Sequence, residues 1–171
     1  RDVKKSLRDE ALVDFLFSTG VRVGELAAMD ISNVDFAEGT VTFRGEKSDR
    51  FRTVILDARA KRHLAAYLNS RKDNNPALFV SERLYGGQPR RLKKDAIENI
   101  TKAVGRAAGL HKVLTVHVFR RTLATRLADK ECPLEVIQEI LGHRSPTTTK
   151  RYVAKNITRI RRQVVKYMDA A

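Results

Sequence analysis

The sequence predicts a single domain that is mainly α-helical and contains a small antiparallel β-sheet. Apolar residues recur at three- and four-residue spacing over most of the chain, which is typical of amphipathic helices. They alternate with polar residues only between about residues 34 and 56, around glycine-containing turns. A chain of 171 residues, 42% of them hydrophobic, can bury one core but is too short for two. We therefore expect residues 1–171 to form one domain.

The N-terminal part of the chain predicts two helices separated by a glycine. Apolar residues occupy helical spacing from Leu7 to Leu16, and the pattern stops at Gly20, where glycine can adopt the left-handed turn that ends a helix. Residues 23–27 predict a second, shorter helix. Arg22 is therefore expected between the end of one helix and the start of the next.

Three short segments with alternating apolar residues predict the sheet. Their apolar positions are Val34 and Phe36, Val41 and Phe43, and Val54 and Leu56. The second turn, at about residues 44–50, is hydrophilic and carries Lys47 near its tip. A lysine at the tip of such a hairpin can reach outward.

Helical periodicity returns after the sheet. Helices are expected around residues 64–68, 96–107 and 116–130, followed by a short helix that Pro133 opens and Gly142 ends. Residues 81–94 are interpreted as a basic loop. A last apolar stripe, within residues 157–168, predicts a small helix that needs a surface to pack on.

The charge balance favours a polyanionic partner. Lysine and arginine number 34 against 20 aspartates and glutamates, and this formal net charge of +14 is spread along the chain. Nucleic acid is the first expectation for such a surplus. Charge alone leaves open a protein that binds anionic membranes or ribosomal RNA, or one that is basic only for solubility.

The sequence lacks the features of secreted, membrane-spanning and zinc-binding proteins. Cys132 is the only cysteine, so the chain can form neither an internal disulfide nor a cysteine cluster for zinc. No apolar run reaches the roughly 18–20 residues of a membrane span, and no signal-peptide core follows the N-terminus. We expect a cytoplasmic protein without a metal or cofactor. Because it starts without Met, it is expected to be a piece of a longer chain.

His117 and Arg120 stand three residues apart at the start of a predicted helix, so both side chains should point the same way. The free N–H groups and the dipole of a helix N-terminus favour phosphate, and an arginine can add two parallel hydrogen bonds to phosphate oxygens. The pair alone is weak evidence, because the same spacing occurs on many solvated helices.

A second motif lies in the segment LGHRSPTTTKRY. His143 follows the glycine that is expected to end a helix, and Tyr152 comes nine residues later, after a threonine-rich turn. Taken singly, His143 could be a capping residue and Tyr152 a half-buried aromatic. The joint occurrence is more specific than either residue.

Together with STGVRVGEL around Arg22 and the hairpin lysine Lys47, these motifs resemble the tyrosine recombinase family, also called the phage integrase family, in residue type, order and spacing. The resemblance extends from about Leu7 to Tyr167. It implies the α+β catalytic-domain fold of that family, with a three-stranded antiparallel sheet at one edge. It also implies a site-specific recombinase, Xer-like or a mobile-element integrase, that cleaves and rejoins DNA through a covalent 3′-phosphotyrosine without metal or ATP.

The resemblance assigns six active-site residues, namely Arg22, Lys47, His117, Arg120, His143 and Tyr152. The two arginines would hold the negative charge that develops on the phosphate, and Tyr152 would be the nucleophile. His117 would accept or relay the tyrosine proton, Lys47 would protonate the departing 5′ oxygen, and His143 would hydrogen-bond a non-bridging oxygen.

Some of these assignments have competitors. The predicted hairpin also offers Arg44, Arg50 and Arg52 in place of Lys47. One departure from the family pattern is Arg121, where many members carry a second histidine, and it puts no catalytic role in doubt. Five further residues are expected to bind the DNA backbone, namely Arg90, Arg91, Lys93, Arg121 and Arg144.

By resemblance, the partner is double-stranded DNA, bound by a homotetramer that assembles on it, whereas the isolated domain is expected to be monomeric. The family's N-terminal core-binding domain, which closes a clamp around DNA, is not expected within these residues. The stripe from Ile157 to Met168 suits exchange between neighbouring subunits or packing on its own domain.

Two other functions remain as alternatives. A type IB topoisomerase uses similar residues to nick and reseal one duplex, although the L-G-H and T-T-x-x-Y motifs favour a recombinase. A catalytically silent DNA-binding descendant would be expected to have lost an active-site residue, and all six are present.

Overall fold

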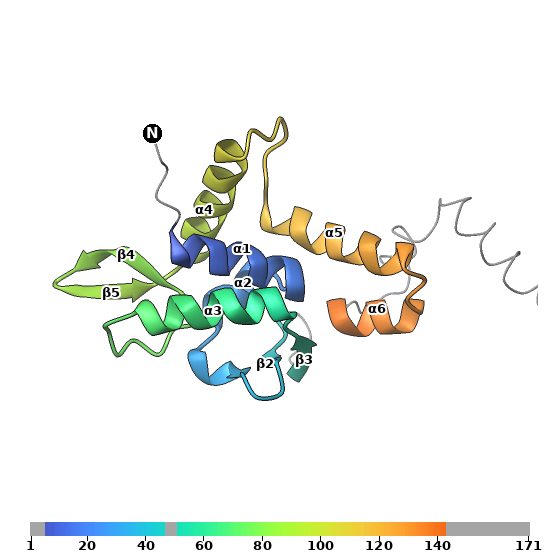
Figure 1. The fold of residues 1–171 in the computed structure, drawn as a ribbon, viewed down its shortest axis with the longest axis horizontal. Helices are drawn as coiled ribbons and strands as arrows, with labels where there is room; N and C mark the ends of the chain where they lie inside the picture. Colours follow the sequence, from blue (N-terminus) through green and yellow to red (C-terminus); the bar gives the residue numbers. More distant parts are fainter. Residues whose placement is uncertain (1–5, 47–50, 143–171) are drawn as a thin grey trace, which may run out of the picture.

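A computed structural model gives the structure of residues 6–46 and 51–142, and it confirms the mainly helical chain with a small three-stranded antiparallel sheet (Figure 1). The helices are α1 (Leu7–Thr19), α2 (Val23–Ala28), α3 (Ala58–Ser70), α4 (Lys94–Ala107), α5 (Val116–Asp129) and α6 (Leu134–Leu141). The strands are β1 (Val34–Asp35), β2 (Thr40–Arg44), β3 (Phe51–Ile55), β4 (Val80–Tyr85) and β5 (Gln88–Arg91), and a 3₁₀ turn, η1, covers Ile31–Asn33. No helix in these two ranges is long and apolar enough to cross a membrane.

The three-stranded sheet has the order β1-β2-β3, as the alternating pattern predicts. Val41 pairs with Val54 and Phe43 pairs with Arg52, and the three apolar residues of these pairs are buried. Because residues directly opposite each other in an antiparallel pair point to the same face, Arg52 lies on the core side of the sheet. This register brings a charged side chain to an inward position.

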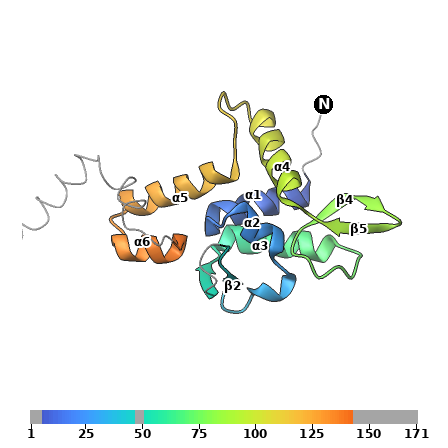
Figure 2. The ribbon, with the colours of Figure 1, turned by 180° about the vertical axis from the view of Figure 1, so that it is seen from behind.

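The prediction of a loop at residues 81–94 is wrong. Residues 80–91 form an antiparallel hairpin, β4–β5, which is turned by Gly86 and Gly87, both with positive φ, and Lys94 is the first residue of α4. Most of β4 is exposed, so the strand lacks the apolar alternation by which a half-buried strand is recognised. The hairpin projects from the domain at the end opposite to α6 (Figures 1 and 2).

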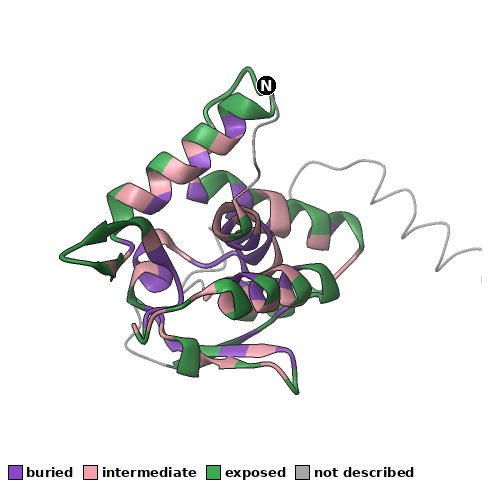
Figure 3. Cartoon of the chain, turned by 60° about the vertical axis from the view of Figure 1, so that its left-hand side comes forward, coloured by how far each residue is buried: buried purple, intermediate pink, exposed green. Residues whose placement is uncertain are grey.

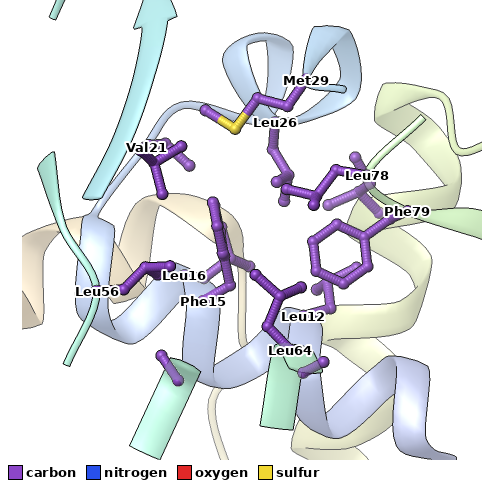
Figure 4. Packing of buried hydrophobic residues seen from close by; sticks show 14 of the residues in the cluster. Leu12, Phe15, Leu16, Val21, Leu26, Met29, Leu56, Leu64, Leu78 and Phe79 are labelled. Carbon is purple, nitrogen blue, oxygen red and sulfur yellow. The ribbon is translucent and has the colours of Figure 1, made fainter. Parts of the chain in front are cut away.

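The main core surrounds α1. Leu12, Phe15 and Leu16 on this helix are fully buried and meet side chains from α2, α3 and the segment before β4 (Figure 4). Ser6 caps the start of the helix by accepting the Asp9 N–H, and Gly20 ends it in the left-handed conformation. A continuous apolar core therefore fixes the position of the turn that carries Arg22.

A second, smaller apolar cluster joins α5 to α6. It consists of Ala124, Ala128, Ile137 and Leu141. The two helices lie side by side. Figure 3 shows that buried residues lie toward the interior of the molecule and exposed residues along its outside. Gly20 allows α1 to approach this pair, since a Cβ at Gly20 would lie 2.8 Å from a methyl carbon of Leu123. The C-terminal end of α6 is thereby brought to the end of α1.

Candidate active site

Three guanidinium groups from distant parts of the chain meet at the C-terminal end of α6. They belong to Arg22 at the start of α2, Arg52 in β3 and Arg120 in α5. All three donate hydrogen bonds to the last carbonyl oxygens of this region, those of Leu141 and Gly142. These carbonyls have no partner within the helix and carry its negative dipole end, which explains why cations gather there.

Arg120 is the most deeply placed of the three, with 5% of its surface exposed. Its Nη1 donates to the carbonyl oxygen of Gly20 at 2.7 Å, and its Nη2 donates to that of Leu141. The side chain therefore joins the end of α1 to the end of α6 from a position on α5.

Arg22 is held by Glu25. Nη1 of Arg22 donates to Oε1 of Glu25 at 3.0 Å, and the backbone N–H of Arg22 donates to Oε2 at 2.7 Å. Its Nη2 also reaches the carbonyl oxygen of Gly142 at 3.3 Å. About a fifth of the Arg22 side chain, 22%, is exposed, so part of this guanidinium can meet a ligand.

Glu25 is a site residue that the sequence reasoning missed. Its side chain is fully buried and accepts hydrogen bonds from both Arg22 and Arg52. Burial alone would raise the pKa of this carboxyl, but the Arg22 N–H and the nearby guanidiniums of Arg52 and Arg22 hold that pKa below its ordinary value. The available signal was the spacing, because an acidic residue three positions after a helix start can accept the N-cap N–H.

Arg52, which the sequence offers as an alternative to Lys47, lies in β3. Its Nη2 donates to Oε2 of Glu25 at 2.9 Å, and its Nη1 donates to the carbonyl oxygen of Leu141 at 3.0 Å. The signal for this position was the strand period, since Arg52 shares the inward face with Val54.

His117 is the second residue of α5, one turn before Arg120, as the motif predicts. The two side chains differ in environment, because His117 is exposed whereas Arg120 is buried. His117 can therefore exchange a proton with a group that approaches from solvent.

Lys47, His143, Arg144 and Tyr152 lie outside the described residues. Two of their sequence neighbours, Glu46 and Gly142, belong to the described residues. Glu46 forms an ion pair with Lys94 at 2.6 Å, and its carboxylate lies so close to Gly24 that a Cβ there would come within 2.2 Å of an oxygen. Gly142, the neighbour of His143, ends α6 in the left-handed conformation.

The other predicted DNA-binding residues differ in their exposure and in their contacts with neighbouring groups. Arg90, Lys93 and Arg121 are exposed, and the guanidinium of Arg90 lies 4.5 Å from the centre of the Tyr85 ring. Arg91 instead donates to the carbonyl oxygen of Met29 at 2.7 Å and pairs with Asp30. Arg91 thus anchors the β4–β5 hairpin to the end of α2.

The arrangement is suited to binding a phosphate. Two of the three guanidiniums, those of Arg22 and Arg52, share the carboxylate of Glu25. Arg22 and Arg120 are held by neighbouring groups that preorganise them. In the two described ranges, no group of three His, Cys, Asp or Glu residues could hold a metal ion.

Comparison with known proteins gives consistent matches. Residues 1–159 match the sequence profile of the Phage integrase family. Tyrosine recombinase XerA of Pyrococcus furiosus is 34% identical over 87% of this chain and 51% of its own length. Tyrosine recombinase XerD of Oceanobacillus iheyensis is 32% identical over 99% of the chain and 58% of its own. The chain spans about half the length of the curated relatives it matches.

Solved structures support the same fold. The crystal structure of XerA recombinase superposes with a TM-score of 0.79 at 35% identity, covering 95% of this chain and 57% of that one. The XerH site-specific recombinase bound to its difH substrate, in a pre-cleavage complex, has a TM-score of 0.74 at 24% identity, covering 96% and 49%. The second likeness concerns the fold alone.

Proposed function

Because this chain belongs to the phage integrase family, we propose that it is the catalytic domain of a site-specific recombinase that cleaves and rejoins DNA through a covalent 3′-phosphotyrosyl intermediate. The observation that carries the proposal is the meeting of Arg22 and Arg120 at the end of α6, directly before the sequence that contains His143 and Tyr152. In-line attack on a phosphodiester develops negative charge on the phosphate oxygens, and two preorganised arginines can stabilise that charge.

In the proposed reaction, the phenolic oxygen of Tyr152 attacks the phosphorus, the bond to the 5′ oxygen breaks, and a 3′-phosphotyrosyl bond forms. The tyrosine has an unperturbed pKa near 10 and must lose its proton as it attacks, and the exposed His117 is the proposed acceptor. Lys47 would protonate the departing oxygen. The new bond retains the energy of the broken one, so rejoining by a 5′-hydroxyl needs no ATP.

Arg22 and Arg120 have separate tasks in this proposal. Both would stabilise the charge on the non-bridging oxygens, as guanidiniums that donate two parallel hydrogen bonds do best. The partly exposed Arg22 can bind the phosphate directly, whereas Arg120 would exchange one of its carbonyl contacts for the phosphate. His143 would complete the set of donors.

The proposed DNA-binding surface comprises the exposed Arg90, Lys93 and Arg121, together with Arg144. Arg91 belongs to the same proposal, although its contacts with Met29 and Asp30 favour a supporting position behind Arg90. The substrate is double-stranded DNA, bound in the cytoplasm by a homotetramer that includes the N-terminal domain of the longer protein.

The test is a covalent-trapping experiment with the full-length protein and nicked suicide duplexes from the flanks of its own gene. A slowly migrating adduct on a denaturing gel, formed in EDTA and lost in Tyr152→Phe, is expected. Tyr167→Phe is the matched control and should retain the adduct. Tight DNA binding without an adduct would refute catalysis and favour the silent descendant. Relaxation of supercoils without exchange between two duplexes would instead favour the topoisomerase.

A further inference from the structure

Arg52 joins three segments through one side chain. It belongs to β3, and 10% of its side chain is exposed. Its two terminal nitrogens donate in different directions, one to Glu25 and one to the carbonyl oxygen of Leu141, at 2.9 and 3.0 Å. Its guanidinium carbon lies 4.7 Å from the centre of the Phe43 ring on the neighbouring strand. The side chain therefore links the sheet to α2 and to α6.

Each of these segments contacts a residue of the proposed reaction or lies near one in the sequence. Glu25 is the same carboxylate that orients Arg22, and the carbonyl of Leu141 is the same acceptor that Arg120 uses. Lys47 lies five residues before Arg52 in the hairpin sequence, and His143 lies two residues after Leu141. The guanidinium of Arg52 thus shares a hydrogen-bond partner with Arg22 and with Arg120. In the sequence, Arg52 is close to Lys47, and its acceptor Leu141 is close to His143.

The local structure is adapted to Arg52 at a cost in stability. A buried charge is expensive to desolvate, and burial beside Arg22 lowers the pKa of Arg52 despite the opposing effect of Glu25. Its Nε is the buried side-chain nitrogen that finds no acceptor among the described residues. A Cβ at Gly142 would lie 1.9 Å from its Nη1, so α6 has to end in a residue without a side chain. A well-packed apolar residue would serve stability as well or better, which points to a functional reason for the arginine.

We propose that Arg52 is a positioning residue, which holds the Lys47 hairpin in register with the Arg22–Glu25 pair and the end of α6. It acts through other groups and does not touch the DNA. This inference rests on the proposed function. Because Lys47 is the proposed acid for the leaving oxygen, loosening the hairpin should impair protonation of the leaving group before it impairs DNA binding.

A leaving-group experiment separates positioning from a structural contribution. Full-length wild type, Arg52→Gln and the charge-matched Arg62→Gln, an exposed residue of α3, are compared in single-turnover cleavage. One suicide substrate has the natural 5′ oxygen at the scissile bond, and the other has sulfur there. Because a thiolate leaves without a proton, the sulfur substrate does not need a positioned acid.

The expected result is a loss of about 100-fold in the cleavage rate of Arg52→Gln on the oxygen substrate, as for other misplaced groups. Most of this loss should disappear on the sulfur substrate, with DNA affinity unchanged and Arg62→Gln behaving as wild type. Lys47→Ala should show the same rescue, and adding Arg52→Gln to it should cost little more, since the two act on one step.

Two results would overturn the inference. Equal rates for wild type and Arg52→Gln would do so, and so would an equal loss on both substrates. Should Arg52→Gln not fold, Arg52→Lys keeps the charge and the stem but can reach only one acceptor at a time, and it should show a smaller loss with the same rescue. A wild type that forms no adduct would refute the proposed function itself, whereas a reactive wild type with an unaffected Arg52→Gln refutes only the positioning role.

Discussion

Arg120 donates a hydrogen bond of 2.7 Å to the carbonyl oxygen of Gly20, a residue that precedes it by 100 positions. The same guanidinium reaches Leu141, so three segments depend on one buried side chain. Arg120 is thus a structural contact as well as a proposed phosphate ligand, and its removal should have two separable effects.

Arg120→Ala should lower the free energy of unfolding by about 3 kcal/mol, because two buried carbonyls lose a charged donor, and it should abolish adduct formation. Urea unfolding followed by circular dichroism measures the first effect, and the suicide-substrate gel measures the second. The neighbouring Arg121→Ala, which removes an exposed side chain of the same helix, should change stability by less than about 0.5 kcal/mol. An equal decrease in the free energy of unfolding of both variants would contradict a stabilising role for the hydrogen bonds of Arg120.

Gly142→Ala should destabilise the chain and slow cleavage, because φ is +60° and the new Cβ would meet Arg52. Gly109→Ala is the control, since it has φ +69° but nothing within 4 Å of an added Cβ. The free energy of unfolding of Gly109→Ala should fall by about 1 kcal/mol, because a side chain disfavours the left-handed conformation. This control should cleave DNA at the wild-type rate. Equal unfolding midpoints in urea for the two variants would mean that the approach of Arg52 to Gly142 is unimportant.

Glu25→Gln should remove a pH-dependent part of the stability. The folded-state pKa of Glu25 lies below its ordinary value of 4.5, so the unfolded chain binds a proton first as the pH falls. The contribution of the carboxylate is complete above the ordinary pKa and is lost as the pH falls through the folded one. Urea unfolding from pH 7 to 3 measures the free energy of unfolding of wild type and of Glu25→Gln. The difference between the two free energies should become smaller in the acid range. A constant difference would count against the charged contacts of Glu25.

Arg90→Glu and Arg91→Gln should have different consequences, although the residues are adjacent. Arg90 is exposed, so Arg90→Glu should weaken DNA binding by the full-length protein and reduce the slope of log affinity against log salt by about 0.9 for each phosphate that is no longer neutralised. Arg91 is bound to Met29 and Asp30, so Arg91→Gln should mainly lower the melting temperature. An unchanged salt slope in Arg90→Glu would remove this residue from the proposed DNA-binding surface.

The sequence predicted the fold where local pattern is decisive. The helix from Leu7 to Thr19 has an apolar face and a glycine end, and the segments around Val41 and Val54 alternate clearly, so helix and sheet could be inferred from their periods. The β4–β5 hairpin was missed, because an exposed hairpin has little apolar alternation. The adjacent Gly86 and Gly87 were the available signal, since two-residue hairpin turns favour residues that tolerate positive φ.

For the candidate site, too, the sequence decided some features and the tertiary structure decided others. The resemblance to the tyrosine recombinase family, which depends on residue type, order and spacing, assigned Arg22, His117 and Arg120 from the sequence. Only the tertiary structure decided that Arg22, Arg52 and Arg120 meet at the end of α6, and that Glu25 lies between two of them. These contacts join residues far apart in the sequence, and they depend on how the apolar faces of α1, α5 and α6 pack. Sequence periodicity reports which face of a helix is buried, but not which distant carbonyl a buried arginine will reach.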